Sequence, residues 1–150
     1  MSEKKTGIFP EEATLDELNR LCEGNMGEVL GIRFTEIGSD FLRATMPVND
    51  STRQPYGLLH GGASVALAET LASVAANLVL PAGSGGYAVG LEINANHIKS
   101  ARSGFVTAHC KPLQLGKRVS VWEIQIRNEA GDLVCMSRMT AAILNKNQAG

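Results

Sequence analysis

Residues 60–80 read HGGASVALAETLASVAANLVL, a nearly continuous apolar stretch that is long enough for a helix. From residue 61 to residue 80 such a helix would be about 30 Å long, at ~1.5 Å per residue. The double glycine Gly61-Gly62 opens the stretch, and the run PAGSGG at 81–86 ends it. A helix that is apolar all round must be covered on all sides. The stretch therefore predicts one long, buried, central helix.

Short extended runs flank this helix on both sides. Residues 32–37 and 41–48 precede it and surround a Gly-Ser-Asp turn, which is typical of a hairpin. Apolar and polar residues then alternate over 87–96, and three more strand-like runs follow at 105–112, 119–128 and 133–144. We also expect a short N-terminal helix over about 14–23, where Thr14 and Glu17 can form a capping box. The pattern predicts an α+β fold in which a curved antiparallel sheet of five to six strands wraps one helix.

Length and composition limit the class of protein. The 150 residues fit a single domain, with flexible tails expected at 1–13 and 145–150. A net charge of -1 argues against a general nucleic-acid binder. Glu69 and Asn77 make the stretch 62–80 a poor membrane span. Cys22, Cys110 and Cys135 are far apart, and no stretch resembles a signal peptide, so we expect reduced thiols in a cytoplasmic protein.

Glu69 is the exceptional residue of the helical stretch, because residues 54–98 contain no lysine and no arginine. An ionised carboxylate removed from water without a cationic partner is costly. Three explanations are open: the fold exposes Glu69 to solvent, another segment supplies a cation that pairs with it, or Glu69 has a functional role. Ser73 lies one turn later on the same stripe of the helix.

The start of the helix is a second candidate feature. Unpaired N-H groups at a helix N-terminus favour an anion, or a carbonyl that becomes one, as in an oxyanion hole. Gly61 lies eight residues before Glu69, about 12 Å along the axis at ~1.5 Å per residue. One helix does not bring both groups to the same atom, whereas a second subunit would. The uncovered sheet edges also predict a homo-oligomer.

A basic strip follows the helix. Residues 93–122 carry five basic side chains and no acidic one. Such a strip in a nearly neutral protein suggests a small polyanionic ligand, and a solvated face is the alternative. Its members are Lys99, Arg102, Lys111, Lys117 and Arg118.

Three segments together carry a resemblance. They are QPYGLLHGGASVALAETLAS (54–73), VGLEINANHIKSARSG (89–104) and CKPLQLGKRVSVWEIQI (110–126). The chain resembles the hotdog-fold acyl-CoA thioesterases of the aryl-CoA branch over roughly residues 14–144. The resemblance implies hydrolysis of an aryl-CoA or related acyl-CoA, with 1,4-dihydroxy-2-naphthoyl-CoA of menaquinone synthesis as the preferred substrate. It also implies active sites at a dimer interface, commonly within a tetramer formed as a dimer of dimers.

The resemblance further implies a role for individual residues. Glu69 would be the catalytic carboxylate, either nucleophile or general base, and the Gly61 N-H would polarise the thioester carbonyl. Gln54 would reach the site from the preceding loop, and Ser73 would position the hydrolytic water. His60 stands just before Gly61 and either caps the helix, fills space or acts in the site, where we expect a positioning role ahead of direct acid/base catalysis. The segments that would hold CoA comprise Gly90, His97, Ile98, Lys99, Ser100, Arg102, Gln114, Leu115, Gly116, Lys117, Arg118 and Val119.

No cofactor is expected, since CoA is part of the substrate, and the histidines lack metal-ligand spacing. Three alternatives stay open. The substrate could be a medium-chain, phenylacetyl- or benzoyl-CoA. A hotdog dehydratase would need a histidine base opposed to an acid. A non-catalytic acyl-CoA-binding module would use the same pocket without turnover.

Overall fold

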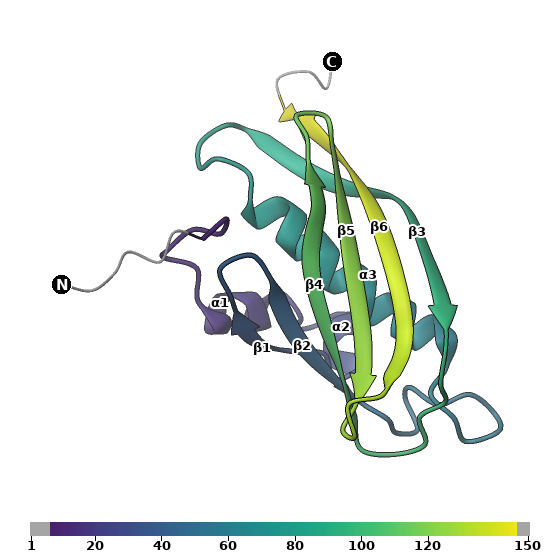
Figure 1. Ribbon diagram of the computed structural model, residues 1–150. Coiled ribbons are helices and arrows are strands. Elements are labelled where there is room, and N and C mark those ends of the chain that lie inside the picture. Colours follow the sequence, from purple (N-terminus) through teal and green to yellow (C-terminus); the bar gives the residue numbers. More distant parts are fainter. Residues whose placement is uncertain (1–6, 147–150) are drawn as a thin grey trace.

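The computed structural model describes residues 7–146, and its core is one antiparallel sheet wrapped around one helix (Figure 1). Six strands lie in the order β1-β2-β4-β5-β6-β3, which confirms the predicted α+β architecture. The elements are α1 (Leu15–Arg20), α2 (Met26–Val29), β1 (Arg33–Ile37), β2 (Leu42–Pro47), α3 (Gly61–Leu78), β3 (Gly86–His97), β4 (Phe105–Leu115), β5 (Val119–Asn128) and β6 (Leu133–Asn145).

Helix α3 is buried on the side that faces the sheet. Leu67 and Leu71 are fully buried there, and small alanines between them let the sheet approach closely. The side chain of Asn77 clamps the far end of α3 to β3, because its Oδ1 accepts from Ala88 N at 2.8 Å and its Nδ2 donates to Ala88 O at 3.0 Å. No helix among residues 7–146 is long and apolar enough to cross a membrane.

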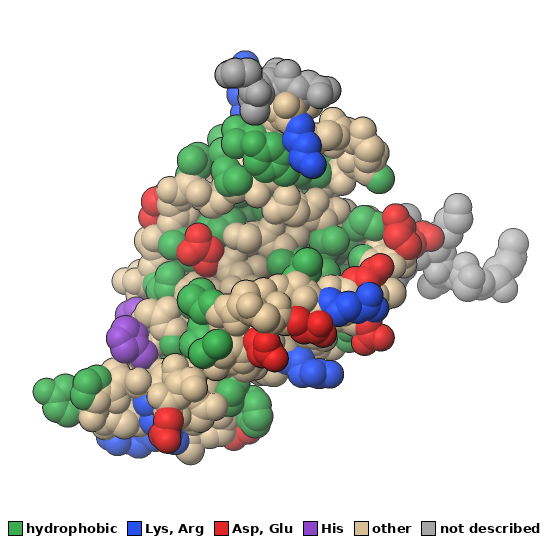
Figure 2. Space-filling model, turned by 180° about the vertical axis from the view of Figure 1, so that it is seen from behind, with side chains coloured by type: hydrophobic (Ala, Val, Ile, Leu, Met, Phe, Trp, Pro, Cys, Tyr) green, Lys and Arg blue, Asp and Glu red, His purple; other side chains and the backbone are tan. Residues whose placement is uncertain are grey.

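The opposite side of α3 is open, which corrects the expectation of a helix covered on all sides. Glu69 and Asn77 are exposed and Val74 is half-buried, since α1 and α2 cover only part of this side. Figure 2 shows the molecule from behind, with hydrophobic side chains reaching the surface over the middle of that face. The single chain therefore leaves an apolar, partly hollowed side next to its helix.

The N-terminal region is more structured than predicted. The capping box at Thr14 and Glu17 is present and begins α1. Asn25, just beyond the predicted helix, caps a second short helix, α2, which was not predicted. Phe9 belongs to the core, so part of the tail expected at 1–13 packs on the domain. Residues 1–6 and 147–150 lie outside the described residues.

The two edges of the sheet differ in length and character. Edge strand β1 has five residues, is interrupted by a bulge and exposes Arg33. Edge strand β3 has 12 residues, pairs with β6 alone among the described strands, and exposes Val89 and Leu91. A long apolar edge strand is a template for pairing with another strand. Edge β3 is thus the better surface for a second copy.

On the outer face of the sheet, the ring of His109 stacks on Phe41, with ring centroids 4.6 Å apart. Burial and the nearby charges of Arg43 and Lys111 lower the pKa of His109, and the carboxylates of Asp40 and Glu36 oppose them. An unfolded histidine binds a proton near pH 6.5. Between that pH and the folded pKa, the unfolded state therefore holds more protons, and stability falls as pH falls.

His109→Gln should flatten this dependence. We expect the free energy of unfolding of the wild type to decline from pH 7.5 to pH 5.5 more steeply than that of His109→Gln, because the variant has no imidazole to protonate. Urea titrations of both proteins at three pH values measure the difference. Parallel declines in the two proteins would show that His109 does not contribute.

Candidate active site

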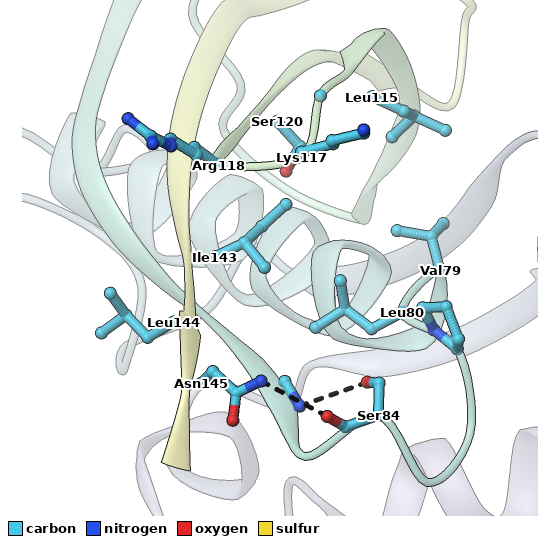
Figure 3. A pocket seen from close by; sticks show the side chains of 13 residues that line it. Val79, Leu80, Ser84, Leu115, Lys117, Arg118, Ser120, Ile143, Leu144 and Asn145 are labelled. Carbon is cyan, nitrogen blue, oxygen red and sulfur yellow. Dashed lines mark hydrogen bonds between the residues drawn. The ribbon is translucent and has the colours of Figure 1, made fainter. Parts of the chain in front are cut away.

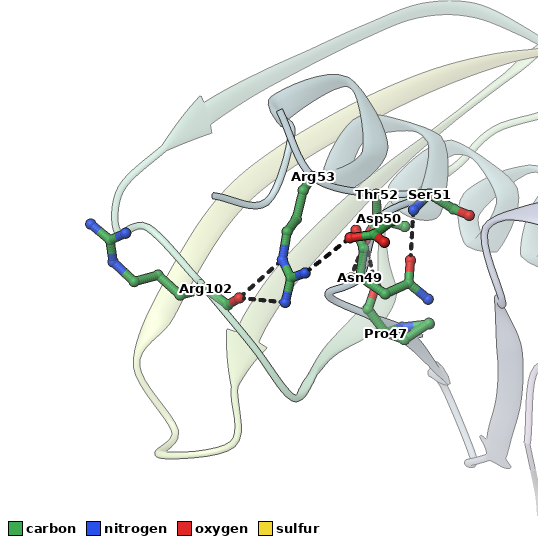
Figure 4. A network of polar contacts seen from close by, with 7 residues as sticks. All are labelled: Pro47, Asn49, Asp50, Ser51, Thr52, Arg53 and Arg102. Carbon is green, nitrogen blue, oxygen red and sulfur yellow. Dashed lines mark hydrogen bonds and ion pairs between the residues drawn. The ribbon is translucent and has the colours of Figure 1, made fainter. Parts of the chain in front are cut away.

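The loop before α3 is held by a network of polar contacts (Figure 4). Thr52 is buried, and its Oγ1 donates to Pro47 O at 2.7 Å and accepts from Asn49 N at 3.0 Å. The guanidinium of Arg53 donates through Nε and Nη2 to Arg102 O, at 3.2 and 3.0 Å. These contacts fix the backbone that leads into Gly61.

His60 is the N-cap of α3. Its Nδ1 accepts from Gly62 N at 2.8 Å, and its carbonyl accepts from the N-H groups of Ala63 and Ser64. Within the described part of the chain, the N-H of Gly61 has no acceptor. The helix thus offers one unpaired donor at its positive end, which is the geometry of an oxyanion hole. The ring of His60 is thus engaged with the backbone of Gly62, and its positioning role stays a prediction.

The unpaired Gly61 N-H lies beside a hollow of about 370 Å³. A Cβ at Gly61 would come within 2.7 Å of His97 Nε2, so glycine is needed for the ring to approach. Gln54 lines the same hollow, and its Oε1 accepts from Tyr56 N. Four residues predicted to hold CoA line this hollow together with Gly61 and Gln54: His97, Ile98, Lys99 and Ser100. A fifth, Arg102, does not line it, but its carbonyl accepts from Arg53, the residue before Gln54.

Lys99 departs from the expectation of a basic strip without competing acids. Its Nζ lies 2.6 Å from Asp132 Oδ2, and this bond, together with one from Asn128, lowers the pKa of Asp132. The acid comes from the β5-β6 turn, which is distant in sequence and was missed. Arg102 contributes its carbonyl to the loop network, while its side chain points away from the loop (Figure 4).

Glu69 lies at the edge of the sheet. The ideal Cβ position of Gly90 is 3.0 Å from Glu69 Oε1, so the carboxylate leans against β3 where a bulge interrupts the strand. Among residues 7–146, the Glu69 side chain has no hydrogen bond and no ion pair. Ser73 lies one turn further on, and its Oγ contacts Met139 Sδ at 3.8 Å. The unpaired carboxylate is exposed to solvent in the single chain.

Glu69 and Ser73 line a hollow of about 360 Å³ between α3 and the α1-α2 turn. Sequence reasoning missed the residues that the turn supplies. The sequence does show apolar side chains around the end of the capping-box helix. The spacing of residues along the chain does not show, however, that this helix lies beside Glu69. The turn contributes Leu21, Cys22, Asn25, Met26 and Gly27.

The remaining predicted CoA-holding residues form a third group at the β4-β5 turn (Figure 3). Leu115, Gly116, Lys117 and Arg118 line a hollow of about 500 Å³ against the C-terminal end of α3. Figure 3 shows the side chains of Lys117 and Arg118 leaving the turn in different directions. In the described part of the chain, neither cation has a carboxylate within salt-bridge distance. Gln114 and Val119 flank this turn on β4 and β5.

The single chain therefore divides the predicted site among three hollows. The Gly61 donor and the Glu69 carboxylate open on different ones, as their separation along α3 requires. Any chemistry that uses both groups on one atom needs a second chain. No cluster of three or more His, Cys, Asp or Glu side chains suited to a metal occurs among residues 7–146.

Comparisons with known proteins agree on one family. A family model described as the thioesterase superfamily matches residues 56–135. The chain is 56% identical to the 1,4-dihydroxy-2-naphthoyl-CoA hydrolase of Escherichia coli, over 91% of this chain and 99% of that protein. It is 48% identical to the proofreading thioesterase EntH of Cronobacter sakazakii, over 91% and 98%. A solved thioesterase from Haemophilus influenzae superposes with a TM-score of 0.90 at 46% identity, covering 95% of this chain and 98% of that chain.

Cys22 offers a chemical probe of the hollow beside Glu69. Burial raises the pKa of all three thiols, but Cys22 is 6% exposed whereas Cys110 and Cys135 are 0% exposed. We expect iodoacetamide to label Cys22 before Cys110 and Cys135, because Cys22 is the more exposed. Because the thiolate is the reactive form, Cys22 should still react more slowly than a free cysteine. Peptide mass spectrometry at pH 7 and pH 9 measures the order. Earlier labelling of Cys110 or Cys135 would contradict this access route.

Proposed function

This chain belongs to the thioesterase superfamily, with the hotdog fold, and is a thioester hydrolase. From that premise we propose that it hydrolyses an aryl-CoA to the carboxylic acid and free CoA. The observation that carries the proposal is the Gly61 N-H, an unpaired donor at the start of an apolar helix. A donor in that position stabilises the negative charge that develops on a thioester carbonyl oxygen under attack.

The catalytic carboxylate comes from a second copy of the chain. A two-fold dimer formed through β3 pairs the two edge strands antiparallel, because an isologous interface uses the same surface in both subunits. The two α3 helices then run in opposite directions, and the start of one approaches the middle of the other. Since Glu69 leans against β3 at Gly90, its carboxylate lies at this seam. Each active site thus uses Gly61 of one protomer and Glu69 of its partner.

Hydrolysis follows from this geometry. The thioester oxygen accepts the Gly61 N-H, which His60 and the Gln54 loop hold in place. Glu69 attacks the carbonyl carbon, or it removes a proton from water that Ser73 positions. The thiolate of CoA then leaves, and in the first route water hydrolyses the resulting mixed anhydride between Glu69 and the acyl group. A single turnover in isotopically labelled water tests for this anhydride, because attack of water on its Glu69 carbonyl carbon places the label in the enzyme carboxylate, whereas the general-base route places it only in the product.

The preferred substrate is 1,4-dihydroxy-2-naphthoyl-CoA, an intermediate of menaquinone synthesis. Support comes from the name of the Escherichia coli relative, which is 56% identical over almost its whole length. Benzoyl-, phenylacetyl- and medium-chain acyl-CoA are the alternatives, and kcat/KM values over such a panel rank them. The same panel separates hydrolysis from binding, because a binding module would release no thiol. A separate assay with an enoyl-CoA tests for a dehydratase, which would hydrate it.

The CoA part of the substrate needs cations and no cofactor. Lys117 and Arg118 are exposed and have no carboxylate nearby among residues 7–146, whereas Lys99 is paired with Asp132. We therefore assign the CoA phosphates to Lys117 and Arg118 ahead of Lys99. Gly90, the segment around His97 and the turn 114–119 complete the CoA contacts.

The assembly we propose is a dimer through β3, with two dimers associating into a tetramer. Support for the dimer comes from the length and apolar exposure of β3. We place the enzyme in the cytoplasm, since Cys22, Cys110 and Cys135 are free thiols.

Glu69→Gln tests the catalytic assignment. The amide keeps the shape of the side chain but neither attacks nor accepts a proton, so kcat should fall about 10²- to 10⁴-fold. Free CoA should inhibit the variant as it inhibits the wild type. The matched control is Glu23→Gln, which changes an exposed acid outside the hollow. Hydrolysis by Glu69→Gln within a few fold of the wild type would exclude Glu69 as the catalytic carboxylate.

Leu91→Arg tests the role of β3. Leu91 is 63% exposed on the open edge, so an arginine there should leave the protomer folded but place like charges across the proposed seam. We expect monomers by analytical ultracentrifugation and loss of hydrolysis. Val29→Arg, at a 69% exposed position on α2, is the control and should remain oligomeric. A monomeric Leu91→Arg protein with full activity would rule out a shared active site.

A further inference from the structure

Two hollows run side by side along the open side of α3, and they share one wall. The first holds Glu69 and measures about 360 Å³. The second measures about 390 Å³ and lies beside Val74, Asn77 and Leu78. Leu21, from the α1-α2 turn, lines both, as do Ser73 and Val74. Together they form a channel that starts at the proposed catalytic carboxylate and continues along the helix.

The lining of this channel suits an uncharged group. Among residues 7–146, no lysine, arginine or histidine lines either hollow, so the phosphates of CoA would find no cationic partner from this part of the chain there. The α1-α2 turn contributes apolar side chains that the single chain leaves in water, since Leu21 is 58% and Met26 is 59% exposed. Contact between these exposed apolar side chains and an apolar ligand would remove apolar surface from water, which favours binding beside the carboxylate.

The turn that presents these side chains is braced. Asn25 accepts from Gly27 N at 2.9 Å through Oδ1, and its Nδ2 donates to Leu21 O at 2.7 Å. Glu28 accepts from Gly24 N at 2.6 Å. A Cβ at Gly27 would lie 2.9 Å from Cys22 Sγ, so the glycine lets α2 pack directly on that residue. Leu21 and Met26 are therefore held by a fixed wall, and a fixed wall can discriminate ligands by size.

We propose that the α1-α2 turn forms the wall of the acyl pocket and that Leu21 and Met26 set the size of the acyl group that is hydrolysed. This inference rests on the proposed function and specifies its substrate class: compact, uncharged acyl groups, including fused aromatic ones. The thioester carbonyl sits at Glu69 and the acyl group extends between α3 and the turn. The CoA arm leaves in the opposite direction, toward the Gly61 end of this helix, where the antiparallel arrangement of the two α3 helices places the C-terminal end of the other protomer's helix and its cationic turn.

Substitutions that fill or enlarge the channel test the proposal. Met26→Trp and Leu21→Trp should lower kcat/KM for 1,4-dihydroxy-2-naphthoyl-CoA at least about 10-fold more than for propionyl-CoA, because one methylene in such a pocket already changes selectivity about 10- to 200-fold. Met26→Ala should shift preference toward decanoyl-CoA. The inhibition constant of free CoA should stay within about twofold of the wild type.

Val29→Trp is the matched control, since it adds the same ring to the same short helix outside both hollows. Met26→Leu, of similar volume, should keep the wild-type preference. Equal changes for every acyl-CoA, or none, would overturn the proposal while the wild type still hydrolyses the panel. If the wild type hydrolyses no member of the panel, the proposed function and this inference both fail.

Protection of Cys22 gives a readout that does not depend on turnover. Cys22 lines the Glu69 hollow. The acid product 1,4-dihydroxy-2-naphthoate should slow its alkylation at least about fivefold when the acid is saturating, because an occupied hollow excludes the reagent. Free CoA should leave the rate unchanged. Protection by CoA and none by the acid would reverse the assignment of the two ends of the substrate.

Discussion

The packing of α3 against the sheet is the contact on which the other features depend. Its inward side alternates leucines with alanines, and fully buried side chains of the sheet, such as Trp122 and Ile124, fill the space that the alanines leave. A small-residue side lets a sheet curve closely around a helix. This packing fixes the rotation of the helix, which directs Glu69 outward, and it fixes the end where Gly61 presents its N-H.

A consequence of that packing is that the site is incomplete in one chain. The orientation of α3 about its axis that buries Leu67 and Leu71 leaves the side with Glu69 open to solvent. The distance along the helix also separates Glu69 from Gly61, so that the two residues line different hollows. The long apolar edge β3 lies beside the same carboxylate. One symmetric contact would thus cover the edge strand, shield the carboxylate and complete the site. The proposed catalysis and the proposed assembly have the same physical origin.

The fold was predictable from periodicity, because a long apolar run and six alternating segments admit few arrangements. The capping box at Thr14 placed α1 correctly, whereas α2 was missed because four residues carry no period. For the candidate site, local signals located the Gly61 donor. They did not show that Glu69 is exposed in the chain, that Asp132 pairs with Lys99, or that the α1-α2 turn lies beside Glu69. Those features depend on contacts between segments distant in sequence, which spacing does not encode.

Subunit complementation distinguishes an active site shared between two protomers from one built within a single chain. Glu69→Gln removes the carboxylate. Gly61→Pro removes the N-H at the first helical position, where the backbone accommodates proline, and it also displaces the His97 ring, which a Cβ at Gly61 would approach to 2.7 Å. Unfolding and refolding an equal mixture should give heterodimers with one intact site, and native mass spectrometry counts them. A shared active site predicts recovery of up to about one quarter of wild-type hydrolysis from two inactive parents. Heterodimers that stay as inactive as the parents would contradict it.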